Sequence, residues 1–272
     1  MRATAFVVLA GLLAGCTSTM FEEPRITLSP YYAVYQLRGD MSVQTDPGGG
    51  APLQNNPRQS LQVFGMDRHK NDVGFRAEVG DGFGGLRVDY YRLDFGTSRK
   101  GILNADWGTL LEDDLVRSEA TMDEVRLSYI QPLLHTTTTW RDEDLDLNFG
   151  AGGEFAFRDM QFSAFTDDLM RRQNVPIEGQ NLGINVRCRA KWTEIAVDLD
   201  YMISPHFVLG GDFDGVNQDL ELRASYAIPL RDFTFFAGYR YSQLTAGGKA
   251  DNAEYAAKLF IDGFQFGLTV SI

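Results

Sequence analysis

The feature that most constrains this chain is a strict alternation of apolar and polar side chains. In the stretch LDLNFGAGGEFAF (145–157), apolar side chains occupy Leu145, Leu147, Phe149, Phe155 and Phe157, and polar ones occupy Asp146, Asn148 and Glu154. A period of two residues is that of an extended strand with one apolar and one polar face. In a soluble barrel or sandwich the apolar face packs on a core, whereas in an outer-membrane barrel it meets lipid.

The same alternation continues from residue 25 to the C-terminus. It recurs at 26–34, 73–79, 86–95, 124–129, 182–192, 195–201, 219–228 and 233–241. The parity slips at Tyr90-Tyr91, which predicts a bulge, and slips again where 182–192 continues into 195–201. No helix-period segment of comparable length competes with these strands, so we predict an all-β chain.

Composition narrows the function classes. A formal charge of −12 and a pI of about 4.7 argue against nucleic acid as a partner, because phosphate binding needs a basic face. Two Cys and three His argue against a disulfide framework and a Cys/His metal site. The mean hydropathy of −0.21 is too polar for a bundle of membrane helices. No cofactor is predicted.

The N-terminus has the layout of a secretory signal: a basic residue, an apolar run and then small residues. Its end, Leu13-Ala14-Gly15-Cys16, resembles the lipobox of bacterial lipoproteins. The resemblance implies cleavage before Cys16 and acylation of that residue, and Thr17 in place of Asp implies sorting to the outer membrane. We therefore predict a signal peptide over 1–15, a lipidated tether over 16–24 and a barrel domain over 25–272. The alternative is an ordinary secretory signal with a chance Cys.

The connections between strands are of two kinds. Long polar segments marked by Gly and Pro occupy 39–59, 96–120 and 158–181; short turns or links occupy 81–84, 204–206 and 229–232, and a longer polar link occupies 133–142. In an up-and-down arrangement the long segments fall at one end and the short turns at the other, as in outer-membrane barrels. The alternation of apolar and polar residues continues along the whole chain after residue 25, so we expect one domain.

The C-terminus supplies a family resemblance. GFQFGLTVSI (263–272) resembles the terminal strand of Gram-negative outer-membrane β-barrel proteins, although it ends in Ile272 where an aromatic residue is usual, and GYRYSQL (238–244) resembles the last hairpin of small barrels. The resemblance implies an antiparallel up-and-down transmembrane β-barrel in the outer membrane, in contact with lipid and assembled by the barrel-assembly machinery. We expect about ten strands, with eight or twelve as alternatives.

In this arrangement the apolar residues of 145–157 face lipid, whereas Asp146, Asn148 and Glu154 face the lumen. The charges predicted to line the lumen are Arg187, Arg189, Lys191, Asp198, Asp200, Glu221, Arg223 and Arg240, and Arg76, Glu78, Arg126 and Lys258 also lie on polar faces. In a narrow barrel such charges either pair and close the channel or line a small pore whose selectivity they set.

Other candidate sites are weak. His69, His135 and His206 lack a Ser and acidic partner at a recognisable spacing, and they are expected in surface links. Glu112, Asp113 and Asp114 lack the spaced ligands of a cation loop. Phe162, Phe165 and Leu169 fit a short amphipathic helix or a loop packing its own apolar residues. Cys188 is expected to face lipid.

The function predicted from these features is that of a non-enzymatic outer-membrane barrel. Such a barrel is structural, or acts through its loops on a partner that the sequence does not identify, or forms a narrow pore. Two alternatives belong to other classes: a soluble, lipid-anchored, lipocalin-like barrel and an outer-membrane lipid-modifying enzyme. Membership of the barrel superfamily does not choose among them, because its members serve as pores, anchors, adhesins and occasionally enzymes.

Overall fold

The structure is a computed structural model that describes residues 25–48, 51–66, 69–204, 208–212, 215–229, 231–250 and 253–272. The predicted signal peptide, Cys16 and the tether lie outside this range. Ten long antiparallel strands dominate the described residues: β1 (Arg25–Val43), β3 (His69–Gly80), β4 (Gly85–Thr97), β6 (Leu115–Trp140), β7 (Glu143–Thr166), β8 (Arg172–Trp192), β9 (Ile195–Ser204), β11 (Asn217–Ala227), β12 (Phe233–Ala250) and β13 (Ala253–Ser271). Within the described residues, no helix is long and apolar enough to cross a membrane.

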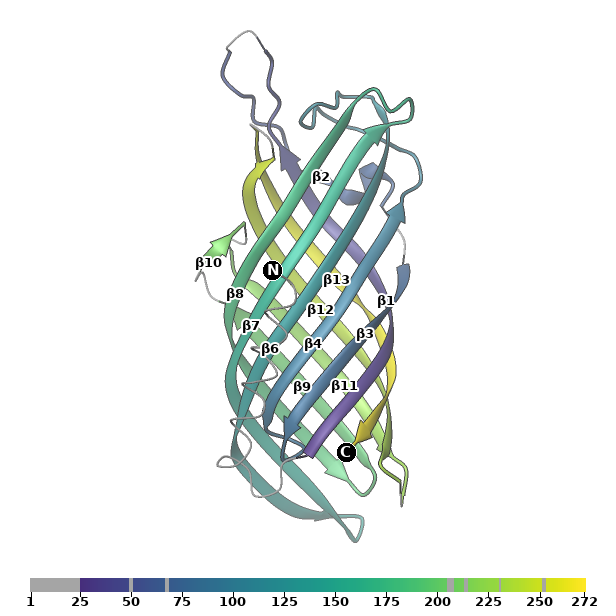
Figure 1. Cartoon of the computed structure of the whole chain (residues 1–272), viewed down its shortest axis with the longest axis vertical. Helices are drawn as coiled ribbons and strands as arrows, with labels where there is room; N and C mark the ends of the chain where they lie inside the picture. The colour runs from purple at the N-terminus through teal and green to yellow at the C-terminus, as the bar shows by residue number, and fades with distance from the viewer. Residues whose placement is uncertain are drawn as a thin grey trace.

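The ten strands close into a barrel (Figure 1). Each strand pairs with its neighbours along the chain, and β1 pairs with both β3 and β13, which joins the two ends of the sheet. Off this ring lie β2 (Gln59–Ser60), β5 (Gly101–Ile102), β10 (Val208–Gly211) and a single turn of 3-10 helix, η1 (Leu61–Phe64). The prediction of an up-and-down antiparallel barrel of about ten strands is thus confirmed over the described residues.

The two ends of the barrel differ. Arg25 begins β1 at the same end at which β13 finishes, because Ile26 and Ile272 exchange backbone hydrogen bonds. The connections 81–84, 141–142, 193–194 and 228–232 lie at this end, which we call the turn end; the longer connections 44–68 and 98–114 lie at the other, the loop end. The predicted asymmetry of connections therefore holds for these segments.

Three predicted connections were wrong in detail. Segment 158–181 is mostly strand, because β7 and β8 run on to a short turn at 167–171. Segment 133–142 is a hairpin in which β6 and β7 pair down to Trp140 and Glu143, so it extends the sheet at the turn end. The predicted short turn at 204–206 was expected with the other short turns, but Ser204, the last residue of β9, lies at the loop end, because β9 runs toward that end from the turn at 193–194.

The parity slip after residue 192 is a chain reversal and not a continuation of the strand. Trp192 pairs with Ile195 and Arg187 pairs with Asp200, so β8 and β9 form a tight hairpin. Thr193 takes the left-handed backbone conformation, with φ of 52°, in the turn. The turn residues Thr193 and Glu194 include no Gly, Asn or Pro, so they lack the usual sequence signature of such a hairpin.

The slip at Tyr90-Tyr91 has a different cause. The inward and outward positions of β4 alternate without a break through this point, and the register irregularity lies later, between Asp94 and Gly96. The change at Tyr91 is chemical: the inward positions carry Arg87 and Asp89 before it, and apolar side chains after it. The predicted bulge at this site was therefore wrong.

This reversal of polarity recurs around the barrel. In the half toward the turn end, outward positions are apolar and inward positions are largely polar or charged; toward the loop end the pattern inverts. The first polar outward residues, which mark the change, are Gln36, Asn71, Arg92, Asp123, Asp159, Gln180, Gln218 and Asp262. They are neighbours in the register, since Arg92 pairs with Asp123 and Asp123 with Asp159. We call this line the polarity boundary.

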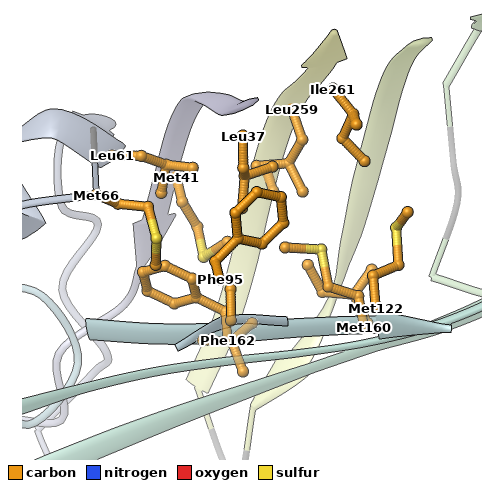
Figure 2. Close-up of a cluster of buried hydrophobic side chains, with 14 of the residues drawn as sticks. Leu37, Met41, Leu61, Met66, Phe95, Met122, Met160, Phe162, Leu259 and Ile261 are labelled. Carbon is orange, nitrogen blue, oxygen red and sulfur yellow. The ribbon is translucent and has the colours of Figure 1, made fainter. Parts of the chain in front are cut away.

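Beyond the polarity boundary the barrel has an apolar core. Figure 2 shows part of it, with side chains from β1, η1, β4, β6, β7 and β13 meeting inside the barrel. On the other side of the boundary the outward apolar belt spans nine residues of β1, from Ile26 to Val34, and eleven of β8, from Leu182 to Trp192. Nine to eleven residues is the length with which a tilted strand crosses a bilayer.

The polarity boundary predicts unequal effects of two matched substitutions on β13. Phe266 lies in the outward apolar belt and is 49% exposed, so Phe266→Arg should lower the free energy of unfolding by about 2–4 kcal/mol. Phe260 also faces outward but lies beyond Asp262, so Phe260→Arg should cost less than about 1 kcal/mol. Urea unfolding in phosphatidylcholine vesicles compares the two variants. Equal losses would contradict a membrane limit at the boundary.

Candidate functional site: the charged interior

Buried charges fill the barrel on the turn-end side of the polarity boundary. Among the described residues they comprise eight arginines, Arg76, Arg87, Arg126, Arg158, Arg187, Arg189, Arg223 and Arg240, and eight carboxylates, Glu78, Asp89, Glu124, Glu154, Asp198, Asp200, Asp219 and Glu221. All except Glu78 and Arg189 are buried. We call this set the charge layer. Its formal charges balance, as the high cost of an unpaired buried ion requires.

Glu124 is the most heavily shared carboxylate of the charge layer. One of its oxygens lies 3.0 Å from Nε of Arg126 and 2.7 Å from Nη2 of Arg240, and the other accepts a hydrogen bond from Arg158. Arg240 also lies 2.6 Å from Asp219, and Arg126 lies 3.1 Å from the same carboxylate. These contacts tie β6, β7, β11 and β12 together across the lumen.

Other pairs link neighbouring or opposite strands. Arg76 on β3 donates to Asp89 on β4 at 2.7 Å and makes a two-bond contact with Glu221 on β11, at 2.9 and 2.7 Å. Arg187 on β8 donates to Asp200 on β9 at 2.7 Å, directly across the hairpin. Bidentate and in-register pairs of this kind are the strong form of the arginine–carboxylate interaction.

The structure places most of the sequence-predicted charges together. Arg187, Asp198, Asp200, Glu221, Arg223 and Arg240 are buried in the charge layer, Arg189 is half-buried at its edge, and Lys191 is exposed at the turn end. Asp198 and Asp200 come from β9 and not from an extension of β8. Lys258 was assigned wrongly: it lies on the outward face beyond the polarity boundary, next to Phe260.

Sequence reasoning missed several members of the charge layer. Arg87, Asp89, Glu124, Arg158 and Asp219 were not among the predicted lumen charges, although most stand on the polar faces of strands that the alternation identified. The inward placement of Glu154 was predicted, and its membership of a charge layer was not. The available signal was parity: each of them is an even number of residues from another inward charge on its own strand. What the sequence did not indicate is which of these charges meet across the lumen.

Beyond the charge layer, two long connections fold into the barrel instead of extending away from it. Leu61 and Phe64 of η1 and Trp107 of the 98–114 connection are almost fully buried. The ring of Phe64 lies 4.8 Å from that of Trp107 and 5.6 Å from that of Phe162 on β7. These residues close the lumen at the loop end with an apolar plug.

At the turn end a vestibule of about 610 Å³ opens below the charge layer. The 81–84 turn folds into it, because Arg187 donates to the Phe83 carbonyl at 2.7 Å and Arg189 donates to the Gly82 carbonyl. Within the charge layer, a gap beside Arg126 and Glu154 measures about 10 Å³, which is space for about one water.

The remaining candidate residues do not assemble a second site. His135 lies exposed in β6, with Asn148 at 2.8 Å and Thr137 at 3.5 Å as its hydrogen-bond partners; the His69 side chain and His206 lie outside the described residues. In the described chain no three His, Cys or acidic residues group as metal ligands. Cys188 is a free, exposed thiol on the outward face.

The segment around Phe162 forms no helix. Phe162 and Phe165 belong to β7, and Leu169 lies in the turn at 167–171 with a positive φ of 60°. In this turn Asp167 accepts hydrogen bonds from Lys100 at 2.5 Å and Arg117 at 3.0 Å, and these cations lower the pKa of its carboxyl group. Asp114 of the acidic run pairs with Arg171 at 2.5 Å, so salt bridges link the loop-end connections to one another.

No protein-family model matches the chain, and no curated protein matches it. Among solved structures it is similar to Ail, the attachment invasion locus protein of Yersinia pestis, at 12% identity and a TM-score of 0.27, over 89% of this chain and 99% of that one. It is also similar to the toluene transporter TodX of P. putida, at 9% identity and a TM-score of 0.32, over 91% and 89%. It is similar as well to OccK7 (OpdD) of Pseudomonas aeruginosa, at 10% identity and a TM-score of 0.20, over 92% of this chain and 99% of that one. At these identities and TM-scores the likeness assigns neither a family nor a function to the chain.

The sharing of Glu124 predicts a large effect of its neutralisation. Glu124→Gln leaves three arginines short of a carboxylate in a buried setting and should lower the free energy of unfolding by about 3–5 kcal/mol. The matched control on the same strand is Glu119→Gln, whose exposed pair with Arg172 should contribute about 0–1 kcal/mol. Urea unfolding of both variants in vesicles is the measurement. A mild loss in Glu124→Gln would show that the charge layer adds little stability.

Proposed function

We propose that this chain is a non-enzymatic outer-membrane β-barrel that is closed to ions and acts through the surface at its loop end. The observation that carries the proposal is the inversion of polarity along the strands. An apolar belt of bilayer height surrounds a charged interior, and this is the arrangement of a barrel whose outer wall meets lipid. The lipocalin-like alternative requires residues 145–157 to line an apolar cavity, whereas Phe155 and Phe157 point outward.

Closure of the lumen rests on two barriers in series. The charge layer pairs its ions across the barrel and leaves gaps of about one water, and the apolar plug around Phe64 and Trp107 follows it toward the loop end. An ion that crosses must part buried salt bridges and then enter an apolar core, and both steps are costly. A narrow pore is the alternative function.

The orientation follows from the connections and the termini. In outer-membrane barrels the short turns face the periplasm and the longer loops face outward, so the turn end is the periplasmic end of this barrel. Beyond the polarity boundary the wall is polar outside and apolar inside, like that of a water-soluble barrel. The loop end would therefore project from the membrane, and its 167–171 turn exposes Leu169 and Met170 by 70% and 85%. A binding partner would meet this surface.

An acylated Cys16 fits the same orientation. Eight residues separate Cys16 from Arg25, so a lipid on Cys16 lies within about 30 Å of the turn end. This distance allows insertion into the inner leaflet of the outer membrane. If the lipobox is processed, mass spectrometry of the purified protein should show a diacyl or triacyl group on an N-terminal Cys16. An unmodified chain that begins after residue 16 would reject the lipidation.

The closed lumen predicts an electrically silent barrel. Purified protein whose folding is verified by heat-modifiable gel migration should give no stepwise current in planar lipid bilayers, because no continuous water path crosses the charge layer and the plug. Stable current steps would contradict closure and support the narrow pore. In that case the ion selectivity should change in Arg240→Gln, which alters the charge layer at the centre of the barrel.

A further inference from the structure

The vestibule at the turn end has an excess of cationic side chains. Its wall includes six arginine and lysine residues, Arg25, Arg87, Arg187, Arg189, Lys191 and Arg223, against four carboxylates, Glu78, Asp81, Asp146 and Glu194. Four of these cations, Arg87, Arg187, Arg189 and Arg223, also belong to the charge layer. The first three are paired there with Asp198 or Asp200. The vestibule cations outside these pairs are the buried Arg223 and the exposed Arg25 and Lys191.

Arg223 is the buried arginine of this wall that no described carboxylate holds in a salt bridge. It is 7% exposed, yet its Nη1 has no hydrogen-bond partner among the described residues. Asp198, Glu78 and Glu221 act on it only through longer-range electrostatic attraction. Its contact is with the ring of Phe236, 4.9 Å from the guanidinium carbon. The other buried arginines at the vestibule are held by carboxylates: Arg187 by Asp200 and Arg87 by Glu78 and Asp200.

The register explains why Arg223 is left over. Arg223 on β11 pairs across the sheet with Asp198 on β9, and Asp198 pairs with Arg189 on β8. Arg189 donates to Oδ1 of Asp198 at 2.6 Å, so one carboxylate stands between two guanidinium groups and is engaged by one of them. The second oxygen of Asp198 has no hydrogen-bond partner among the described residues, and a water between it and Arg223 is the competing arrangement.

A second donor lies unused on the same row of the sheet. Arg223 pairs with Gly238 on β12, and Gly238 pairs with Gln265 on β13. Nε2 of Gln265 is buried without an acceptor in the described part of the chain, and a Cβ built on Gly238 would lie 3.1 Å from it. Arg223 and Gln265 are thus two buried donors on one row of the sheet, separated by Gly238, and of the two Arg223 lines the vestibule. A buried donor of this kind calls for an acceptor, either a water or a ligand that enters from the vestibule.

We propose that the vestibule binds a small soluble anion through an oxyanion group, phosphate or carboxylate, with Arg223 as the primary ligand and Lys191 as a second cation nearer the mouth. The planar guanidinium group matches two oxygens of such a group, and a bound anion removes the cost of a buried unpaired cation. The cavity is larger than one phosphate ion, so the site suits a molecule that carries the oxyanion. The inference is independent of whether the barrel conducts.

The test uses the full-length protein folded in a neutral detergent. Inorganic phosphate and, separately, citrate are titrated at constant ionic strength and followed by isothermal titration calorimetry. We expect saturable binding of at least one probe, weakened about tenfold or more in Arg223→Gln. The control is Arg38→Gln, which alters an exposed arginine on the outer wall near the loop end and should leave binding unchanged. The bound probe should also raise the urea midpoint of the wild type but not that of Arg223→Gln.

Several outcomes would overturn the proposal. One is the absence of saturable binding of both probes, and another is equal affinity in Arg223→Gln and wild type. In the absence of ligand, a fall in the urea midpoint of Arg223→Gln as large as that of Arg187→Gln would show that Arg223 is paired inside the barrel, through Asp198. Displacement of the bound probe by phosphatidylglycerol in mixed micelles would assign the oxyanion to a lipid headgroup and reject a soluble ligand.

Discussion

In the membrane placement that we propose, the architecture depends on one constraint: a backbone that crosses lipid must satisfy all its hydrogen bonds within the sheet, which a closed ring of strands achieves. The pairing of β1 with β13 closes this ring. Closure gives every strand an inner and an outer face. Successive side chains alternate between these faces, so the position of a residue along its strand decides whether it points into the lumen or outward. Once the outer face meets lipid, the charges on these strands have no place except the lumen, and a lumen of ten strands is narrow enough for them to meet.

The charge layer fixes the register between neighbouring strands as well as contributing to stability. Replacing buried ion pairs by apolar groups is often neutral or stabilising, so their number alone is weak evidence that they hold the barrel together. A slip of one residue between β8 and β9, however, would turn the side chains of one strand to the opposite face, so that either Arg187 or Asp200 would leave the lumen for the outer wall. The same slip would break the in-register salt bridge between them. The charges therefore penalise wrong pairings far more strongly than they reward the correct one.

Much of the fold was accessible from the sequence, because strand parity is a local property that residue chemistry reports directly. The outward placement of Phe155 and Phe157 and the approximate strand number followed from it. What remained hidden depends on long-range contacts. The β8–β9 turn lacks a turn signature at Thr193, the partners of each lumen charge lie on distant strands, and the apolar residues of the long connections fold inward although the segments look polar. The change at Tyr91 resembled a bulge because two different causes give the same sequence pattern. One is an exchange of the polar and apolar sides of the barrel wall, and the other is an extra residue in the strand.

The polarity boundary also determines what a ligand in the vestibule could do. The vestibule opens at the turn end, and the charge layer and the apolar plug separate it from the loop end. A solute bound at Arg223 would then exchange with one compartment alone, so occupancy would follow the concentration on that side and no net transport would result. Arg223, Asp198 and Arg189 lie on one row of the sheet, and Arg189 also donates to the Gly82 carbonyl of the 81–84 turn. An anion that draws Arg223 toward itself would change the electrostatic field at the carboxylate of Asp198.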